Sequence, residues 1–294
     1  MKKYIWISGG LFVIFLFGVI GLPYIYLSGN RTYQEVSIPA DGYQLNGYLN
    51  IGSDPEGLWI VLTHGNRKAG QSHELYQQIR GNLPEQISVL AIDFRGFGGS
   101  SAEGLEQADN IINRIDDIEA AVDYLNDNNG VLDNQIVLIG HSLGASRVMR
   151  AALDHNYRIV IPIGLGDWDS LLANPDSIES YRQKFYNNTG VFVGSNRVIV
   201  EGEQFSSEIL FSKCPETPVW LVFASRDDGR EPLSPSYGEA HNRCGQDLQW
   251  SVIPFSNHMY GTESTEFPKI LSGIVSRIYL SFLMMRLDNI LENA

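Results

Sequence analysis

The sequence is poor in cysteine and in basic residues, and both shortages exclude whole classes of function. Only two of the 294 residues are cysteines, Cys214 and Cys244, and neither belongs to a CxxC pair. A zinc site built on cysteines is therefore disfavoured. Lys and Arg number 21 against 34 Asp and Glu, which gives a net charge of −13, and no basic run occurs. Because phosphate recognition needs clustered positive charge, no nucleic-acid partner is expected.

The chain also lacks internal repeats and low-complexity tracts, and what remains is a globular composition. Hydrophobic residues make up 44% of the chain and charged residues 19%. Such a composition supplies a core and argues against a disordered or collagen-like chain, or one held together by disulfides alone. No linker divides the part of the chain that follows residue 30, so we predict one domain over residues 31–294.

The longest uncharged run lies near the N-terminus. No charged residue occurs in residues 4–30, directly after two lysines. As a helix, residues 4–27 would be about 36 Å long, enough to cross a hydrocarbon layer of about 30 Å with some tilt. A cleaved signal peptide has a shorter apolar stretch and a small-residue cleavage site, so residues 1–30 are interpreted as an uncleaved signal anchor. By the positive-inside rule, the remainder of the chain is then periplasmic or extracellular.

Beyond this run, apolar segments alternate with amphipathic ones. Two segments with an antiparallel opening pattern come first, and continuous apolar runs typical of parallel strands buried on both faces follow. The predicted strands are 32–38, 43–51, 59–63, 88–93, 135–140, 158–164, 219–224 and 248–255. The clearest helical pattern places these residues on one face: Ile111, Ile115, Ile118, Val122 and Leu125. The alternation predicts an α/β fold, a mainly parallel sheet with helices on both faces. Residues 165–217 hold no long strand and are expected to form an insertion, a short cap.

The segment IVLIGHSLGAS (136–146) contains a G-x-S-x-G motif that starts at Gly140 and is centred on Ser142. It follows a predicted buried strand and precedes a predicted helix. A sharp turn in that context exposes the serine hydroxyl above the sheet, and glycines on both sides let the neighbouring elements approach. The N-terminus of the helix directs its positive end toward developing negative charge. Ser142 is therefore the predicted nucleophile.

A second segment, WIVLTHGNRKAG (59–70), ends a predicted strand on His64-Gly65 and continues with Asn66. Acyl transfer requires two backbone N–H groups aimed at the oxyanion of the tetrahedral intermediate. The N–H groups of Asn66 and Leu143 are the predicted donors. His64 lies at this corner, and we interpret it as an orienting histidine rather than the base.

A serine nucleophile needs a base, and the base needs an acid that holds its tautomer. His258 follows the last predicted strand, at the carboxyl end of the sheet, and is the predicted base. His241 lies in a predicted helix and is expected at the surface. Asp227 follows the preceding strand and is the predicted acid. Asp228 beside it and Asp167 after an earlier strand remain alternatives.

Taken together, these residues resemble the α/β-hydrolase superfamily. The chain order Ser142, Asp227, His258 is similar to that family's order, and GHSLG and DFRGFGGSS (93–101) are similar to its recurring pieces. The D-x-R-G-x-G-x-S form resembles the serine-aminopeptidase and prolyl-oligopeptidase-related branch, although many esterases share it. The resemblance covers about residues 32–285. It implies an eight-stranded sheet, with the insertion acting as a lid.

The motifs and the resemblance predict a membrane-anchored serine hydrolase that cleaves a carboxylic ester, thioester or amide through an acyl-enzyme. The expected partner is a small-molecule or peptide acyl substrate, and no metal or organic cofactor is implied. An acyltransferase, and a non-catalytic binding protein on the same fold, stay open as alternatives. Arg67 and Lys68 could attract an anionic substrate, although solvated loop charges are the simpler interpretation.

The two cysteines are expected at the amino edge of the sheet. Cys214 precedes Leu221 by seven residues, and Cys244 precedes Ser251 by seven. The two strands concerned are expected to be adjacent and parallel, so equal offsets would bring both cysteines to one edge. A disulfide there and a pair of separate buried thiols are equally compatible with the sequence.

Overall fold

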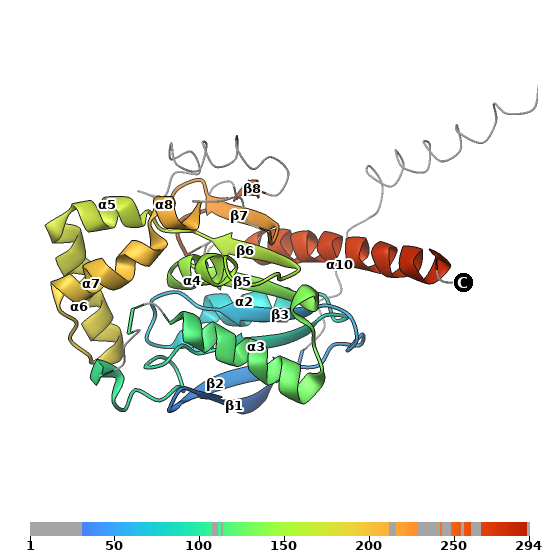
Figure 1. Cartoon of the computed structure of the whole chain (residues 1–294), viewed down its shortest axis with the longest axis horizontal. Coiled ribbons are helices and arrows are strands. Elements are labelled where there is room, and N and C mark those ends of the chain that lie inside the picture. The colour runs from blue at the N-terminus through green and yellow to red at the C-terminus, as the bar shows by residue number, and fades with distance from the viewer. Residues whose placement is uncertain are drawn as a thin grey trace, which may run out of the picture.

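The computed structural model describes residues 31–107, 111–112, 114–211, 216–227, 242, 248–253, 256–259 and 266–292. Within this part of the chain an eight-stranded sheet runs through the molecule (Figure 1). Its strands are β1 Gln34–Ala40, β2 Tyr43–Asn50, β3 Trp59–Thr63, β4 Ser88–Ile92, β5 Ile136–His141, β6 Ile159–Ile163, β7 Val219–Ala224 and β8 Leu248–Ile253. Their order across the sheet is β1-β2-β4-β3-β5-β6-β7-β8.

The sheet is antiparallel only where β2 pairs with β1 and with β4, and it is parallel from β4 to β8. The prediction of a mainly parallel eight-stranded sheet is therefore confirmed. Each strand begins and ends within two residues of its predicted limits. The apolar runs of β3 to β7 are buried almost throughout, as strands covered on both faces should be, whereas β1, β2 and β8 are partly exposed.

Helices cover both faces of the sheet. The helices α3 Ile115–Asn129 and α4 Leu143–Ala151 pack on one face, and α2 Glu74–Asn82 and α10 Glu266–Glu292 pack on the other. Successive strand side chains alternate between these two layers, as a pleated strand requires. In β3, for example, Val61 packs with α3 and α4, whereas Ile60 packs with α2 and α10.

The helix α3 begins at Ile115, although the apolar pattern starts at Ile111. Arg114 has a φ of 57°, in the left-handed region that a right-handed helix cannot continue through. Ile111 is nevertheless buried, in a separate cluster with Trp168 and Phe185. The helical pattern therefore included one residue whose burial has a different cause.

The segment between β6 and β7 folds as a helical cap. Its helices are α5 Trp168–Ala173, α6 Pro175–Thr189, α7 Ser195–Gly202 and α8 Ser207–Leu210. They enclose a small apolar cluster that includes Phe185, Val198 and Phe205 and that also contains Ile111 from outside the cap. The Trp168 indole N–H donates to the Ser146 hydroxyl on α4 at 3.0 Å, and this bond ties the cap to the sheet layer.

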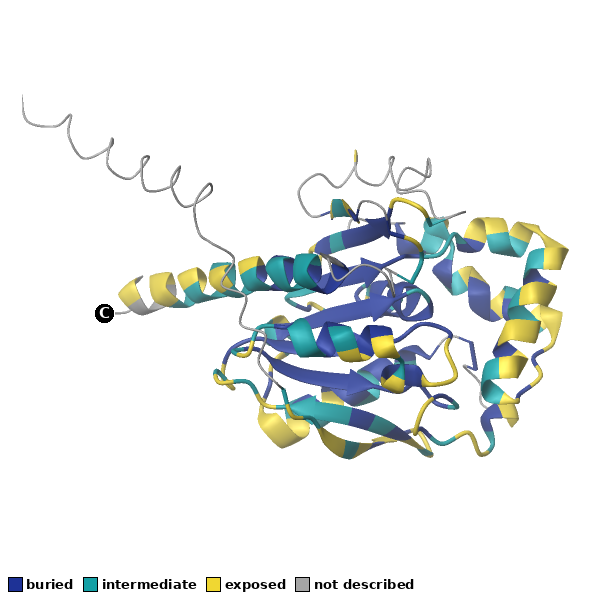
Figure 2. Cartoon of the chain, turned by 180° about the vertical axis from the view of Figure 1, so that it is seen from behind, coloured by how far each residue is buried: buried dark blue, intermediate teal, exposed yellow. Residues whose placement is uncertain are grey.

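Among the described residues, α10 is the helix long and apolar enough to cross a membrane, over Phe267–Asp288, by length and composition alone. Its first half belongs to the core, because Phe267, Leu271 and Val275 are buried against the sheet. The second half extends beyond the sheet and is largely exposed (Figure 2). The predicted anchor, residues 4–27, lies outside the described residues.

The strands β7 and β8 are adjacent and parallel, as expected for the cysteine argument, but their register differs from the one assumed. Leu221 pairs with Trp250, and Ser251 pairs with Val222. Two residues at equal distances before Leu221 and Ser251 are therefore shifted by one residue relative to each other. The hydrogen bonds between the strands set this register, and it cannot be counted from the sequence. Cys214 and Cys244 lie outside the described residues, so the disulfide stays a prediction.

Candidate active site

Ser142 lies at the turn between β5 and α4, with φ 55° and ψ −109°. A positive φ is uncommon for a residue with a side chain, and such strain persists only where the surroundings hold it. Here the Ser142 N–H donates to Ile163 O at 2.8 Å, and the Ser142 carbonyl accepts from Ala145 N at 3.1 Å. These bonds hold Ser142 at the carboxyl edge of the sheet.

The two glycines of the G-x-S-x-G motif are required by close backbone approaches. A Cβ on Gly140 would lie 2.3 Å from the carbonyl oxygen of Gly144. A Cβ on Gly144 would lie 2.4 Å from the Thr63 hydroxyl oxygen. The motif therefore exists because α4 starts directly against β3 and β5.

A continuous hydrogen-bonded chain runs through Ser142, His258 and Asp227. His258 Nε2 lies 2.8 Å from Ser142 Oγ, and His258 Nδ1 lies 2.8 Å from Asp227 Oδ2. With the carboxylate accepting, Nδ1 carries the proton and Nε2 accepts from the serine hydroxyl; this tautomer is assigned from the partners. The His258 side chain is 26% exposed and that of Asp227 only 5%. A substrate can thus reach the ring, while the acid is shielded from water.

The loops that carry the acid and the histidine are bonded to each other. Arg226 N donates to Ser256 O at 2.8 Å, and Ser225 N donates to Ile253 O at 3.0 Å. These bonds extend the β7–β8 ladder past the strand ends. They fix the separation of Asp227 from His258.

The rival residues lie elsewhere or outside the described part. Asp167 accepts from Ser170 N at 3.0 Å and from the Ser170 hydroxyl at 2.6 Å, so it caps α5 at its N-terminus. Asp228 and His241 lie outside the described residues.

Burial of His64 is complete, and both of its ring nitrogens are engaged. Nδ1 donates to Gly65 O at 2.6 Å, and Nε2 accepts from Phe94 N at 3.0 Å. Burial lowers the pKa of His64, and the nearby Asp93 carboxylate opposes this only in part. The neutral ring thus braces the loop, as the interpretation of an orienting histidine expected.

His141 and Tyr76 brace the histidine loop from behind. The His141 ring stacks on the His258 ring, with 5.0 Å between centroids, and its Nε2 donates to the His258 carbonyl at 2.9 Å. The Tyr76 hydroxyl donates to His141 Nδ1 at 2.8 Å and accepts from Gly65 N at 2.6 Å. Burial raises the pKa of Tyr76, so the phenol keeps its proton and remains a donor. The sequence carried no signal for Tyr76, which lies on the unpredicted helix α2.

The segments that carry the two predicted oxyanion donors are joined to each other. Leu143 is the first residue of α4, so its N–H is one of the donors without an intrahelical partner. Gly144 N donates to His64 O at 3.1 Å and ties the nucleophile turn to the loop that carries Asn66. Asn66 is buried, and Gly65 beside it approaches Ser142 so closely that a Cβ there would lie 3.0 Å from the serine Cβ.

Asn188, at the end of the cap helix α6, holds Asn66 in place. Its side-chain amide donates to Asn66 O at 3.0 Å and to Asn66 Oδ1 at 2.8 Å. Both bonds use acceptors of Asn66 and none uses its backbone N–H. Sequence reasoning missed Asn188, because 122 residues separate it from Asn66 and it belongs to no motif.

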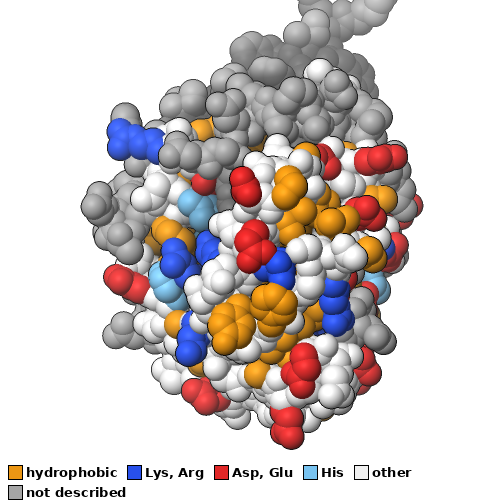
Figure 3. Space-filling view, turned by 90° about the vertical axis from the view of Figure 1, so that its left-hand side faces the viewer, with side chains coloured by type: hydrophobic (Ala, Val, Ile, Leu, Met, Phe, Trp, Pro, Cys, Tyr) orange, Lys and Arg blue, Asp and Glu red, His pale blue; other side chains and the backbone are white. Residues whose placement is uncertain are grey.

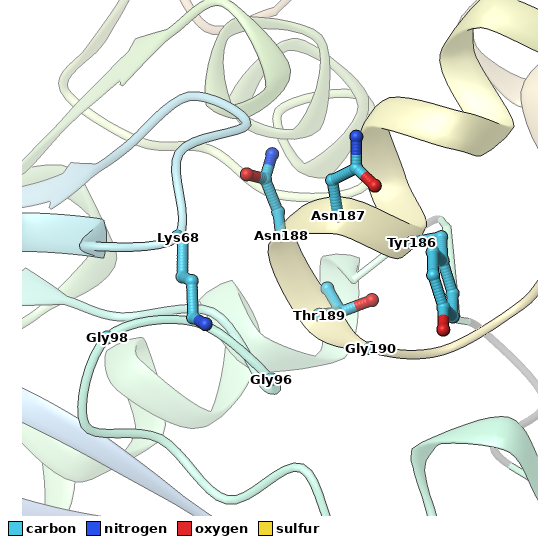
Figure 4. A pocket seen from close by; sticks show the side chains of 8 residues that line it. All are labelled: Lys68, Gly96, Gly98, Tyr186, Asn187, Asn188, Thr189 and Gly190. Carbon is cyan, nitrogen blue, oxygen red and sulfur yellow. The ribbon is translucent and has the colours of Figure 1, made fainter.

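A pocket of about 460 Å³ opens between the Asn66 loop, the glycine-rich turn after β4 and the end of α6. Figure 4 shows the Lys68 side chain extending toward Gly96, opposite Asn188 and Thr189. On the side of the molecule that carries the cap helices, basic side chains lie beside histidines, although the net charge is −13 (Figure 3). Among the described residues, no group of three or more His, Cys, Asp or Glu side chains is arranged to hold a metal ion.

The model of the alpha/beta hydrolase family matches residues 60–262, and this chain therefore belongs to the alpha/beta hydrolase family. That match contains the nucleophile turn, the acid loop and the histidine loop.

Two curated relatives and two solved structures illustrate the range of its similarities. The chain is 31% identical over 128 residues to protein phosphatase methylesterase 1 of Schizosaccharomyces pombe, over 41% of this chain and 36% of that protein. It is 28% identical over 153 residues to the uncharacterized protein YfhR of Salmonella typhimurium, over 48% of this chain and 50% of that one. It thus spans half or less of the length of these curated relatives.

The solved structures share the fold. Est1E from Butyrivibrio proteoclasticus with ferulic acid bound gives a TM-score of 0.60 at 17% identity, over 85% of this chain and 99% of that one. The Pyrococcus furiosus esterase Pf2001 gives a TM-score of 0.59 at 17% identity, over 86% of this chain and 93% of that one.

Proposed function

We propose that this protein is a membrane-anchored serine esterase that hydrolyses a small carboxylic ester through an acyl-enzyme. The observation that carries the proposal is the chain of two 2.8 Å contacts from Ser142 through His258 to Asp227. Family membership supports the hydrolase class. The esterase relatives support an oxygen ester over a thioester or an amide.

In the first half of the reaction, Ser142 Oγ attacks the ester carbonyl as His258 Nε2 takes its proton. The carbonyl oxygen becomes an oxyanion, which the N–H groups of Asn66 and Leu143 stabilise. Asp227 keeps the imidazolium oriented and offsets its charge. The imidazolium then gives its proton to the leaving alkoxide, the ester C–O bond breaks, and the acyl group remains on Ser142.

In the second half, a water molecule takes the place of the leaving alcohol. His258 removes its proton, the hydroxide oxygen attacks the acyl carbonyl, and the same two N–H groups stabilise the second oxyanion. The imidazolium returns its proton to Ser142 as the acyl bond breaks. The products are the carboxylic acid and the regenerated serine.

The pocket beside Asn66 bears on the substrate class. Its lining is made of amide, hydroxyl and glycine groups with Lys68 as the positive charge, so a polar or anionic substituent on the ester suits it. One structural neighbour holds ferulic acid, and one relative is named a protein phosphatase methylesterase. We therefore favour a small, polar ester over a long acyl chain.

A fluorophosphonate probe tests the serine chemistry directly. The detergent-solubilised full-length chain should be labelled, and Ser142→Ala should abolish the label. Ser146→Ala, which removes a cap contact on the same helix, should keep it. Labelling that survives Ser142→Ala would refute the assignment of the nucleophile. A chain that takes no label at all would favour the non-catalytic alternative.

The anchor and the compartment are part of the proposal. Residues 4–27 span the bilayer once, and the hydrolase domain lies on the extracytoplasmic side. Alkaline carbonate washing should leave the protein in the membrane fraction. Protease added to spheroplasts, or to the equivalent intact cells, should digest the domain, and a protected domain would reverse the orientation.

A further inference from the structure

The exposed half of α10 carries an apolar stripe on its outer face. Leu280, Met284, Leu287 and Leu291 follow one another at helical spacing, and they are 50%, 60%, 58% and 73% exposed. We call these four residues the α10 stripe. Residues at i, i+4, i+7 and i+11 share one face of a helix, so the stripe is continuous.

The same face of α10 is polar nearer the start of the helix. Lys269, Gly273 and Ser276 occupy the positions that precede Leu280 at the same spacing. The outer face therefore changes from polar to apolar at Leu280. A helix face that only contacts solvent is expected to stay polar along its whole length. A contiguous exposed apolar surface marks an interaction site.

The change occurs where α10 passes the amino edge of the sheet. The Tyr279 hydroxyl donates to Asp54 Oδ2 at 2.9 Å, and Arg286 lies 3.9 Å from Asp54 Oδ1. Asp54 belongs to the loop that precedes β3. The α10 stripe thus begins at the edge of the sheet opposite Ser142.

The described chain enters the domain at the same place. Arg31 donates to Ile87 O at 2.8 Å, to Asn50 Oδ1 at 3.0 Å and to Pro84 O. The loop that holds Asp54 is bonded to this segment, since Asp54 N donates to Gln86 O at 3.1 Å. Arg31 and α10 therefore adjoin two loops that are bonded to each other. The uncharged run of residues 4–30 directly precedes Arg31.

We propose that the α10 stripe lies in the lipid–water interface of the bilayer, beside the point where residues 4–27 enter it. This inference rests on the proposed membrane anchor. The stripe spans about 17 Å of helix, a length suited to lying in the interface rather than to crossing the membrane. The contact is apolar in origin, because a chain of net charge −13 gains nothing from anionic lipid headgroups.

This contact would orient the active site. Ser142, Asp227 and His258 follow the carboxyl ends of their strands, and strands of five or six residues at about 3.3 Å each separate them from the edge that faces the bilayer. The site then opens away from the membrane. A substrate reaches it from the aqueous phase, and the lipids of the anchoring bilayer are not the substrate.

The experiment places an environment-sensitive fluorophore on α10 in the full-length chain. Leu287→Cys and Arg277→Cys are labelled with NBD and incorporated into phosphatidylcholine nanodiscs. Position 277 is the matched control, because it is also exposed and lies on the same helix before the stripe. The unsubstituted chain, labelled in parallel, reports the background from Cys214 and Cys244.

The expected result is blue-shifted emission at position 287 that doxyl-phosphatidylcholine quenches, with several-fold weaker quenching at position 277. Incorporated protein that is quenched at neither position overturns the inference and leaves the anchor standing. Shielding at position 287 without lipid quenching, together with crosslinks between chains, assigns the stripe to a second copy and also overturns it. A chain that stays out of the discs refutes the anchor and this inference together. Ester hydrolysis measured in the same discs shows independently whether the esterase proposal holds.

Discussion

The two edges of the sheet contrast in chemistry although the same strands supply both. At the carboxyl edge the chain places Ser142, His64, Asp227 and His258, and hydrogen bonds engage each of these side chains or the backbone beside it. At the amino edge the exposed apolar end of α10 follows Tyr279, whose partner Asp54 belongs to a loop bonded to the loop that Arg31 binds. The difference shows two physical roles. A satisfied polar network fixes the positions of its side chains, whereas a contiguous exposed apolar surface marks a site of interaction.

The largest effect is expected at Ser142, and the contrast between the two edges would fail if Ser142 were dispensable for activity. Ser142→Ala should lower kcat/KM for a p-nitrophenyl ester by about 10³-fold or more, because no nucleophile remains. Steady-state hydrolysis measures this loss. Ser146→Ala should keep most of the activity, and equal losses in both variants would mean that the first had only disturbed the fold.

The second largest loss of activity is expected at Asp227, the predicted acid. Asp227→Ala should lower kcat by about 10²- to 10⁴-fold, because His258 loses the partner that holds its tautomer. Asp228→Ala serves as the comparison and should cost far less. The opposite ranking would transfer the role of the acid to Asp228.

The buried His64 at the carboxyl edge should make the stability of the protein depend on pH. Burial lowers the pKa of His64 below its unfolded value of about 6.5, so the unfolded chain binds more protons below that pH. The stability from the neutral ring is present in full above about pH 6.5 and is lost as the pH falls, by up to about 1.4 kcal/mol per pH unit. Denaturant unfolding of the full-length chain in detergent, over a pH series, measures it. His64→Gln, which does not titrate, should show a shallower dependence, and equal slopes would contradict neutral burial.

Asn188 tests whether the cap serves the chemistry. Asn188→Ala should lower kcat by about 10-fold with little change in KM, because a mobile Asn66 aims its N–H less well at the oxyanion. Asn188→Asp should behave alike, since a carboxylate cannot donate to the two Asn66 oxygens. Gln183→Ala, on the exposed side of the same helix, is the control. A change in KM alone would assign Asn188 to substrate contact.

The smallest effect is expected at the amino edge. Tyr279→Phe removes the bond to Asp54. Burial, and after it the Asp54 carboxylate, raises the pKa of Tyr279 to about 12. The free energy of unfolding should fall by about 0.5–1 kcal/mol, and kcat should not change. Unfolding and kinetics on one preparation test both statements. A loss of activity would show that the two edges are coupled.

The strand ends explain how much of the candidate site was predictable. Ser142, Asp227 and His258 each follow an apolar run, and in a parallel sheet the ends of such runs meet at one edge. The apolar pattern starts at Ile111, four residues before α3 begins, because the burial of Ile111 against the cap imitates a helical face. The register of β7 with β8 was misjudged, because nothing in one strand records which residue of the other it pairs with.

Tyr76 and Asn188 mark the limit of sequence reasoning. Each acts through one or two bonds to a residue more than ten positions away, and neither residue type implies such a partner. Their roles depend on how helices α2 and α6 pack, which follows from the shapes of many apolar side chains at once.

The sequence by itself determined the α/β class, the positions of the strands and the residues capable of acyl-transfer chemistry. Local periodicity and motif spacing record these features, because they depend on residues close together in the chain. Only the tertiary structure decided that His258 approaches Ser142 within hydrogen-bond distance, that Asn188 holds Asn66, and that the apolar end of α10 lies opposite the site. These features join segments far apart in the chain, and their free energy arises only when the whole sheet has formed.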